Sequence, residues 1–231
     1  MRLLPFLDDV SPRDERRGLV WAAFATVAGQ VERVVMANVV WAFQLAPGLA
    51  ALAFPELPGW LRILLGLYSA TALPPATAVL YGLAAQACRG QHVDAGLAVE
   101  LFRAMAARSL RILAPLYGTF GVLGWLAVAA GGIGPLATVL TLAILGWSVC
   151  ATYWGPIFAA EPGRSFAGIA RESVRLAWRH PERTLLIWVV AGLAVLVGVV
   201  SVGGLVLIVP ALVSILQTHL YEAARTSPPR T

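Results

Sequence analysis

The sequence contains no lysine and few charged residues of any kind. Asp, Glu, Lys and Arg make up 13% of its 231 residues, and hydrophobic residues make up 59%. An average soluble domain carries about 25% charged residues. This composition excludes a disordered chain and disfavours an ordinary soluble domain. All 17 basic residues are Arg and the net charge is +5, which in a chain this apolar indicates a membrane surface before a nucleic acid.

Cysteine and histidine are also scarce, with 2 and 3 residues. Cys88 and Cys150 form no Cys-x-x-Cys pair, and neither His180 nor His219 has a second ligand at metal-binding spacing. The sequence lacks Gly-x-Ser-x-Gly, His-Glu-x-x-His and a phosphate-binding loop. We therefore expect no metal site, no cofactor and no enzymatic activity. We also expect no nucleic-acid partner, because the arginines follow the membrane edge.

What the sequence has instead is four long runs without a charged residue or histidine. They are Val34–Pro55, Ile63–Cys88, Ile112–Ala160 and Thr184–Thr218. Because about 20 apolar residues cross the hydrocarbon core as a helix, each of the first two runs predicts one span. The third is too long for one span and contains the turn signal Gly131-Gly132-Ile133-Gly134-Pro135. It predicts two spans, Ile112–Ala130 and Pro135–Ala159.

The fourth run is either one overlong span or two short ones. Ser201-Val202-Gly203-Gly204 lies in its middle and favours a turn, with the second helix extending to Tyr221. The runs are apolar all round rather than alternating, so they predict helices and not barrel strands. We predict a single all-α integral membrane domain, residues 1–231, with six transmembrane helices. Five spans are the alternative.

The arginines are distributed unevenly between the loops. With six spans, all of them except Arg62 fall on the side of the N-terminus. Cytoplasmic loops of membrane proteins carry an excess of Lys and Arg. The sequence therefore predicts a protein of the inner (plasma) membrane with both termini in the cytoplasm.

The chain also resembles itself at an offset of 72 residues. The matched pairs include Tyr81 with Tyr153, Glu100 with Glu172, Arg103 with Arg175, and Arg111 with Arg183. They predict three repeats, at residues 13–90, 91–163 and 164–226. Each repeat would contain a cytoplasmic amphipathic helix followed by a hairpin of two spans.

Two of the predicted amphipathic helices, Ala95–Leu110 and Ser165–His180, carry arginines on their polar faces. Arg171, Arg175 and Arg179 follow each other at a spacing of four, where like charges repel. Something acidic should therefore face them, either anionic lipid headgroups or an acidic partner protein. The candidate docking residues are Arg103, Arg111, Arg171, Arg175, Arg179 and Arg183.

Polar residues inside the predicted spans are the candidates for contact with a solute. They are Asn38, Gln44, Thr77, Tyr81 and Gln217. Polar side chains in lipid usually hold helices together, so helix packing is the first interpretation. A solute site would require them to line one cavity. Five tryptophans could either stack on sugar rings or pack in the core and at the interfaces: Trp41, Trp125, Trp147, Trp154 and Trp188.

Several short motifs resemble a known family. They are Asn38-Val39-Val40-Trp41, Pro74-Pro75-Ala76-Thr77-Ala78-Val79-Leu80-Tyr81, Arg89-Gly90, and Ala177-Trp178-Arg179-His180-Pro181. Over roughly residues 15–225 the chain resembles the YesL-like family of bacterial integral membrane proteins, whose biochemical function is not established. The resemblance implies six helices and an accessory role in carbohydrate uptake beside ABC-transporter components.

Three functional hypotheses follow. The first is a membrane protein that assists solute transport, with carbohydrate implied by the resemblance. The second is a membrane-embedded substrate-binding component or permease for a small solute. The third is a membrane scaffold that docks a cytoplasmic partner through its arginine-bearing helices.

Overall fold

The structure is a computed structural model, and it describes residues 19–130, 134–201 and 208–226. The described residues form helices and no strand. The helices are α1 (Leu19–Gly29), α2 (Val31–Ala53), α3 (Gly59–Cys88), α4 (Ala95–Ala129), α5 (Pro135–Ala151), α6 (Trp154–Ala160), α7 (Phe166–Arg179), α8 (Pro181–Ser201) and α10 (Val209–Thr226). The predicted all-α architecture is therefore confirmed.

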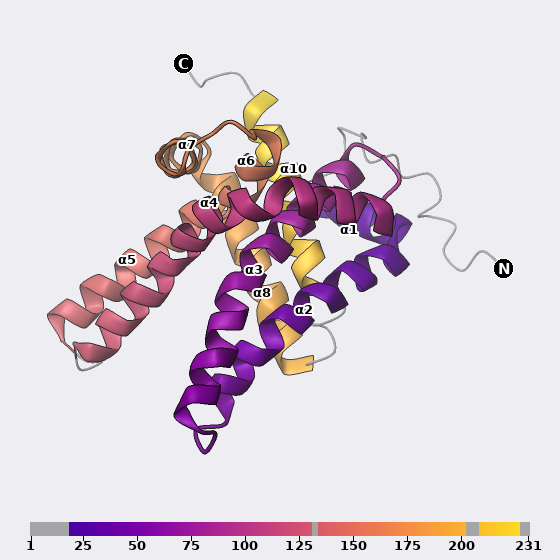
Figure 1. Ribbon diagram of the computed structural model, residues 1–231. Coiled ribbons are helices and arrows are strands. Elements are labelled where there is room, and N and C mark those ends of the chain that lie inside the picture. Colours follow the sequence, from indigo (N-terminus) through magenta and orange to yellow (C-terminus); the bar gives the residue numbers. More distant parts are fainter. Residues whose placement is uncertain (1–18, 131–133, 202–207, 227–231) are drawn as a thin grey trace.

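Three pairs of helices extend toward the same end of the molecule (Figure 1). The pairs are α2 with α3, the second half of α4 with α5, and α8 with α10. At the opposite end lie α1, α6, α7 and the C-terminal part of α10. The helices α2, α3, α4 and α8, and the α5–α6 segment, are long and apolar enough to cross a membrane. The chain is thus a membrane protein of about six helices.

The last apolar run divides into two helices, as predicted, with residues 202–207 of the expected turn outside the described residues. The second of these helices, α10, differs from the other spans. Gln217, His219, Glu222 and Arg225 make its C-terminal half polar, and it is not among the helices that could cross a membrane by length and hydropathy. It nevertheless has eleven buried residues, as many as the much longer α3, and it packs against α3, α1 and α8.

Helix α4 joins two elements that the sequence predicts separately. The amphipathic segment Ala95–Leu110 continues without a break into the predicted span Ile112–Ala130. Asp94 starts the helix, because its carboxylate accepts a hydrogen bond from the Leu97 backbone N–H at 2.7 Å. The helix changes direction along its length (Figure 1). Pro115 lies within it and has no N–H to offer the preceding turn, a common cause of bending.

The predicted span Pro135–Ala159 is instead divided into α5 and α6. The break falls at Thr152 and Tyr153. Pro156 has no N–H for the Thr152 carbonyl, which removes the helical hydrogen bond there. After the break, α6 packs closely on α3, and a Cβ at Gly155 would collide with the ring of Tyr81. Glycine is therefore required where these two helices meet.

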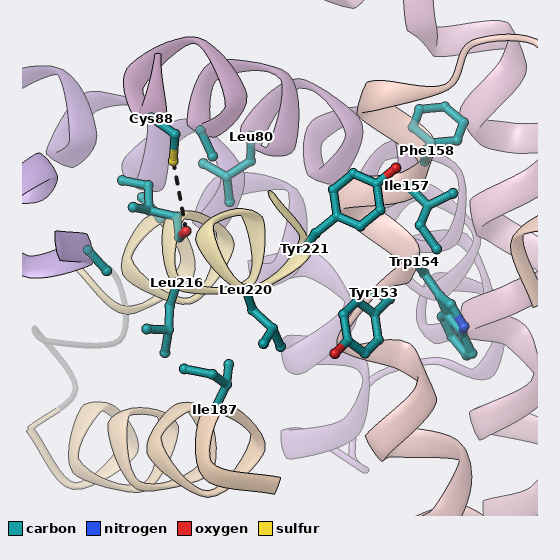
Figure 2. Packing of buried hydrophobic residues seen from close by; sticks show 14 of the residues in the cluster. Leu80, Cys88, Tyr153, Trp154, Ile157, Phe158, Ile187, Leu216, Leu220 and Tyr221 are labelled. Carbon is teal, nitrogen blue, oxygen red and sulfur yellow. Dashed lines mark hydrogen bonds between the residues drawn. The ribbon is translucent and has the colours of Figure 1, made fainter. Parts of the chain in front are cut away.

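The hydrophobic core lies where α3, α6, α8 and α10 meet (Figure 2). Tyr153, at the break before α6, and Trp154, Ile157 and Phe158 of α6 are fully buried. Trp154 is surrounded by three aromatic rings, with centroids of Tyr117, Phe120 and Trp147 at 5.5, 5.6 and 5.1 Å. Tilted and edge-on aromatic pairs at such distances add packing energy beyond their buried area.

The predicted threefold repeat stays a prediction. In the described residues, α1, the first half of α4, and α7 each precede a pair of longer helices. The junctions differ, however. Gln30 separates α1 from α2 and His180 separates α7 from α8, whereas α4 has no break. Residues 13–18 of the first repeat lie outside the described residues.

Candidate functional site

The predicted polar residues inside the spans bind other parts of the protein. Asn38 of α2 is fully buried, and its Oδ1 accepts a hydrogen bond from the Ala211 backbone N–H at 2.8 Å. Ala211 lies in the first turn of α10, where backbone N–H groups have no partner within their own helix. Asn38 therefore supplies from another helix the acceptor that the start of α10 requires.

A second polar contact joins α3 to α10. The Tyr81 hydroxyl donates a hydrogen bond to Gln217 Oε1, across 136 positions of the chain. Tyr81 is buried and Gln217 is half-buried. The fold thus brings these two candidates together, and their polar groups form a hydrogen bond with each other.

Two more contacts join α2 to α3. Trp41 Nε1 donates to the Thr77 hydroxyl at 3.0 Å, and the Tyr68 hydroxyl donates to Gln44 Oε1 at 2.6 Å. Sequence reasoning missed Ser69, whose hydroxyl donates to the Gln44 carbonyl and accepts from the Gly48 N–H, both at 2.8 Å. Thr77 and Tyr81 share one helical face, but neither binds Asn38.

The five candidate polar residues thus lie at three helix–helix contacts. None of them lines the pocket between α2, α3 and α10 or the pocket between α7 and α10. Hydrogen bonds between transmembrane helices contribute about 0.6 kcal/mol each on average. The arrangement holds helices together and does not assemble these residues around one cavity.

Most of the tryptophans are used in the same way. The indole N–H groups of Trp147, Trp154 and Trp188 donate to the hydroxyls of Thr119, Ser173 and Ser148 at 2.6, 3.2 and 3.0 Å. Trp125 differs, with 70% of its surface exposed. The five tryptophans that the sequence singles out therefore do not form one stacking surface.

The candidate docking arginines gather at the end that carries α7. Arg103, Arg111, Arg171 and Arg179 are exposed, and the described residues provide none of them with an ion pair. Arg175 lies 3.7 Å from Glu172 and is 57% exposed, and Arg183 is half-buried. Four of the six candidates are thus free to meet an acidic group from outside.

Arg108 performs a structural task that the sequence did not indicate. Its guanidinium donates to the carbonyls of Phe158 and Glu161, both at 2.8 Å, and lies 4.0 Å from the centroid of the Phe158 ring. Carbonyls at a helix C-terminus have no helical partner and favour a cation. Arg108 therefore fastens the end of α6 to α4. The two hydrogen bonds to the carbonyls replace the water contacts that the guanidinium loses on burial.

A cavity of about 410 Å³ lies between the α6–α7 connection, α7 and α10. Its lining consists of Glu161, Arg164, Glu172, Leu176, Arg179, Tyr221, Ala224 and Arg225. Arg164 lies 2.5 Å from Glu161 and 3.3 Å from Glu172. Burial acts to lower the pKa of Arg164, but the two carboxylates outweigh it and raise that pKa. The sequence marked Arg179 of this group, but not the cavity.

Comparisons with known proteins do not supply a function. No protein-family model, curated protein sequence or solved structure matches the chain. The YesL-like resemblance therefore rests on the short sequence motifs alone.

Proposed function

We propose that this protein assists solute transport as an accessory membrane component and does not carry the solute between its own spans. The main support is the pairing of the polar groups among its helices. Asn38 binds the backbone of α10, Tyr81 binds Gln217, and Thr77 binds Trp41. A permease needs polar groups that converge on a cavity within the spans, whereas these groups are engaged at separate contacts.

The exposed arginines support the accessory role. Arg103, Arg111 and Arg171 lie on the helices α4 and α7, exposed and without an ion pair to any described residue. Exposed arginines are common anchors at protein interfaces and pair well with carboxylates. They would dock an acidic surface of a partner at the cytoplasmic side, which combines the accessory and scaffold hypotheses.

The finer assignments follow from the sequence. The arginine distribution supports an inner-membrane protein with cytoplasmic termini. The YesL-like motifs support a bacterial protein that acts beside a carbohydrate ABC transporter. The role proposed is binding and positioning, with no chemical reaction of its own.

Copurification tests the docking proposal. The tagged protein is isolated from its native membrane in mild detergent, and ABC-transporter subunits are identified by mass spectrometry and quantified. We expect an ABC ATPase or permease subunit to copurify with the wild type. The triple variant R103Q/R111Q/R171Q should retain about a third of it or less, because three exposed charge pairs at about 0.2–1 kcal/mol each contribute about 0.6–3 kcal/mol together.

The matched control uses the other end of the molecule. Glu56 is exposed in the turn between α2 and α3, so E56Q removes one charge there without touching the arginines. Full retention of the subunit by E56Q, with loss in the triple variant, supports docking through the arginines. Equal recovery from both variants would contradict it.

Uptake by the protein alone tests the accessory role against the permease hypothesis. The purified protein is reconstituted into proteoliposomes, and accumulation of radiolabelled maltose, sucrose and glucose is followed. We expect no uptake above that of protein-free vesicles. Saturable uptake that the variant Q217L abolishes would favour the permease and contradict the accessory role.

A further inference from the structure

The cavity between the α6–α7 connection, α7 and α10 has an uneven distribution of partners among its charged groups. Glu161 accepts hydrogen bonds from the Tyr221 hydroxyl at 2.8 Å and pairs with Arg164. Glu172 pairs with Arg164 and with Arg175. Both carboxylates in the lining are therefore engaged by residues of the same chain.

The other two charged lining residues are not engaged in this way. Arg179 at the end of α7 and Arg225 near the end of α10 both line the cavity and are exposed. Neither forms an ion pair with a residue that the structure describes. The lining holds three arginines against two carboxylates, which gives it a net charge of +1. Arg175 pairs with Glu172 from outside the lining and adds a further positive charge nearby. Arginine binds phosphate oxygens through two parallel N–H groups, so a phosphate is a suitable ligand for two arginines that line one cavity without ion pairs.

Helix α7 also shows where the cavity lies relative to a bilayer. Of its apolar residues Phe166, Ile169 and Val174, which recur at helical spacing, only Ile169 is buried. Phe166, Val174 and Trp178 are 40%, 47% and 87% exposed, at a spacing of four residues or its double. An exposed apolar stripe with tryptophan beside a row of arginines is typical of a helix at the membrane interface.

The position of α10 also indicates that the cavity lies at the membrane interface. Its C-terminal part lies at the end of the molecule opposite the α2–α3 turn, together with α6 and α7 (Figure 1). Figure 2 shows Tyr221 of α10 beside Ile157 and Phe158 of α6 in the buried core, and its hydroxyl donates a hydrogen bond to Glu161 of the cavity lining. The cavity is therefore adjacent to the apolar core on one side and to α7 on the other, and the interfacial character of α7 corresponds to the headgroup region of a bilayer.

We propose that this cavity binds the headgroup phosphate of an anionic phospholipid through Arg179 and Arg225. The excess of positive charge favours a lipid with net negative charge over a zwitterionic one. The acyl chains would extend past the exposed apolar side chains of α7, and the engaged carboxylates would hold α7 and α10 at a fixed separation. This site is independent of the proposed transport role, because it requires neither a solute nor a protein partner.

Native mass spectrometry of the delipidated full-length protein in detergent tests the site. Phosphatidylglycerol is titrated against wild type and against R179Q/R225Q, with phosphatidylcholine as the zwitterionic comparison. We expect the wild type to bind one phosphatidylglycerol molecule more tightly than phosphatidylcholine. Because an arginine near anionic lipid contributes about 1 kcal/mol, the double variant should bind it about 30-fold more weakly.

The matched control is R103Q/R171Q, which removes the same charge from exposed arginines outside the cavity lining. It should retain binding within about twofold of wild type. Thermal unfolding in detergent without added lipid should be the same for both double variants, since none of the four arginines forms an ion pair among the described residues. A lower melting temperature restricted to R179Q/R225Q would indicate a structural role and contradict the proposal.

Three further outcomes would overturn it. Equal binding of phosphatidylcholine and phosphatidylglycerol would remove the charge argument. Equal loss in the two double variants would show general attraction between the arginines and lipid. Saturable binding of inorganic phosphate or of a polyglutamate peptide that requires Arg179 and Arg225, with no retained lipid, would assign the cavity to a soluble anion or an acidic protein.

Discussion

The last helix, α10, and the outer helix α5 have opposite surroundings and opposite compositions. Helix α10 contains a glutamine, a histidine and a glutamate, yet eleven of its residues are buried. Helix α5 has no charged, amide or imidazole side chain, yet Ala137 is its one buried residue. Leu136, Val139 and Leu142 of α5 are each more than 60% exposed. The more polar helix is thus the inner one.

This difference follows from the solvent. Lipid chains are as apolar as leucine, so burying α5 in protein would gain little. Polar groups are costly in lipid unless another group binds them. Helix α10 therefore gains from neighbours that supply Asn38 and Tyr81, and α5 gains from lipid. Substitutions in both regions should therefore differ in their effect on stability.

The largest effect is expected at Gly155. A valine there would meet the Tyr81 ring, so G155V should lower the free energy of unfolding by about 3 kcal/mol or prevent folding. The matched change in α5 is G146V, where a Cβ meets nothing within 4 Å. Unfolding in mixed detergent–SDS micelles measures the free energy of unfolding of both variants. Similar losses in the two variants would contradict close packing of α6 on α3.

The next effect is expected at Asn38. N38L leaves the Ala211 N–H without its acceptor in an apolar surrounding, which should cost about 1–2 kcal/mol. T141V in α5 is the comparison, because its hydroxyl bonds only to the carbonyl of Ala137 on the same helix. We expect the second variant to unfold within about 0.5 kcal/mol of wild type in the same assay. If T141V lost as much free energy of unfolding as N38L, or more, the contrast between α10 and α5 would be wrong.

A smaller effect is expected at Tyr81. Y81F keeps the ring that packs against Gly155 and removes only the hydroxyl that donates to Gln217. Loss of one interhelical hydrogen bond should cost about 0.6 kcal/mol. A double-mutant cycle with Q217L in SDS-induced unfolding isolates the pair, and a coupling energy of zero would show that the two side chains do not interact.

The smallest effect is expected at Trp125 in the outer half of α4. Its side chain is 70% exposed, so W125L should leave stability unchanged within about 0.5 kcal/mol. The same residue should be accessible to lipid. In a variant that retains Trp125 or Trp154 as the sole tryptophan, brominated phospholipids should quench the fluorescence of Trp125 strongly and that of Trp154 weakly. Stronger quenching of Trp154 than of Trp125 would place the second half of α4 inside the protein and contradict the prediction.

The charge-free runs predicted the helices because length and hydropathy are local properties of the chain. Gly134-Pro135 starts α5 as its turn signal indicates, and the fourth run divides into two helices. The break between α5 and α6 was missed, although Pro156 was a visible signal. Proline is tolerated in many membrane helices, so its presence alone does not predict a break.

The partners of the polar residues could not be predicted from sequence. Asn38 binds a backbone group 173 positions away and Tyr81 binds a residue 136 positions away. Helical spacing shows which residues share a face, but not which helix that face meets. Arg108 and Arg164 read only as topology markers, because their carbonyl and carboxylate partners become close only after α4, α6 and α7 pack.

The most direct test of the account asks whether water reaches the polar residues inside the spans. Single cysteines are placed at Thr77 and Gln217 in a C88A/C150A background, with R171C as the exposed control. The protein is treated in proteoliposomes with a membrane-impermeant maleimide from both sides. The account predicts rapid labelling of R171C alone. Labelling of both T77C and Q217C that a sugar suppresses would reveal a solute path among the helices and contradict the account.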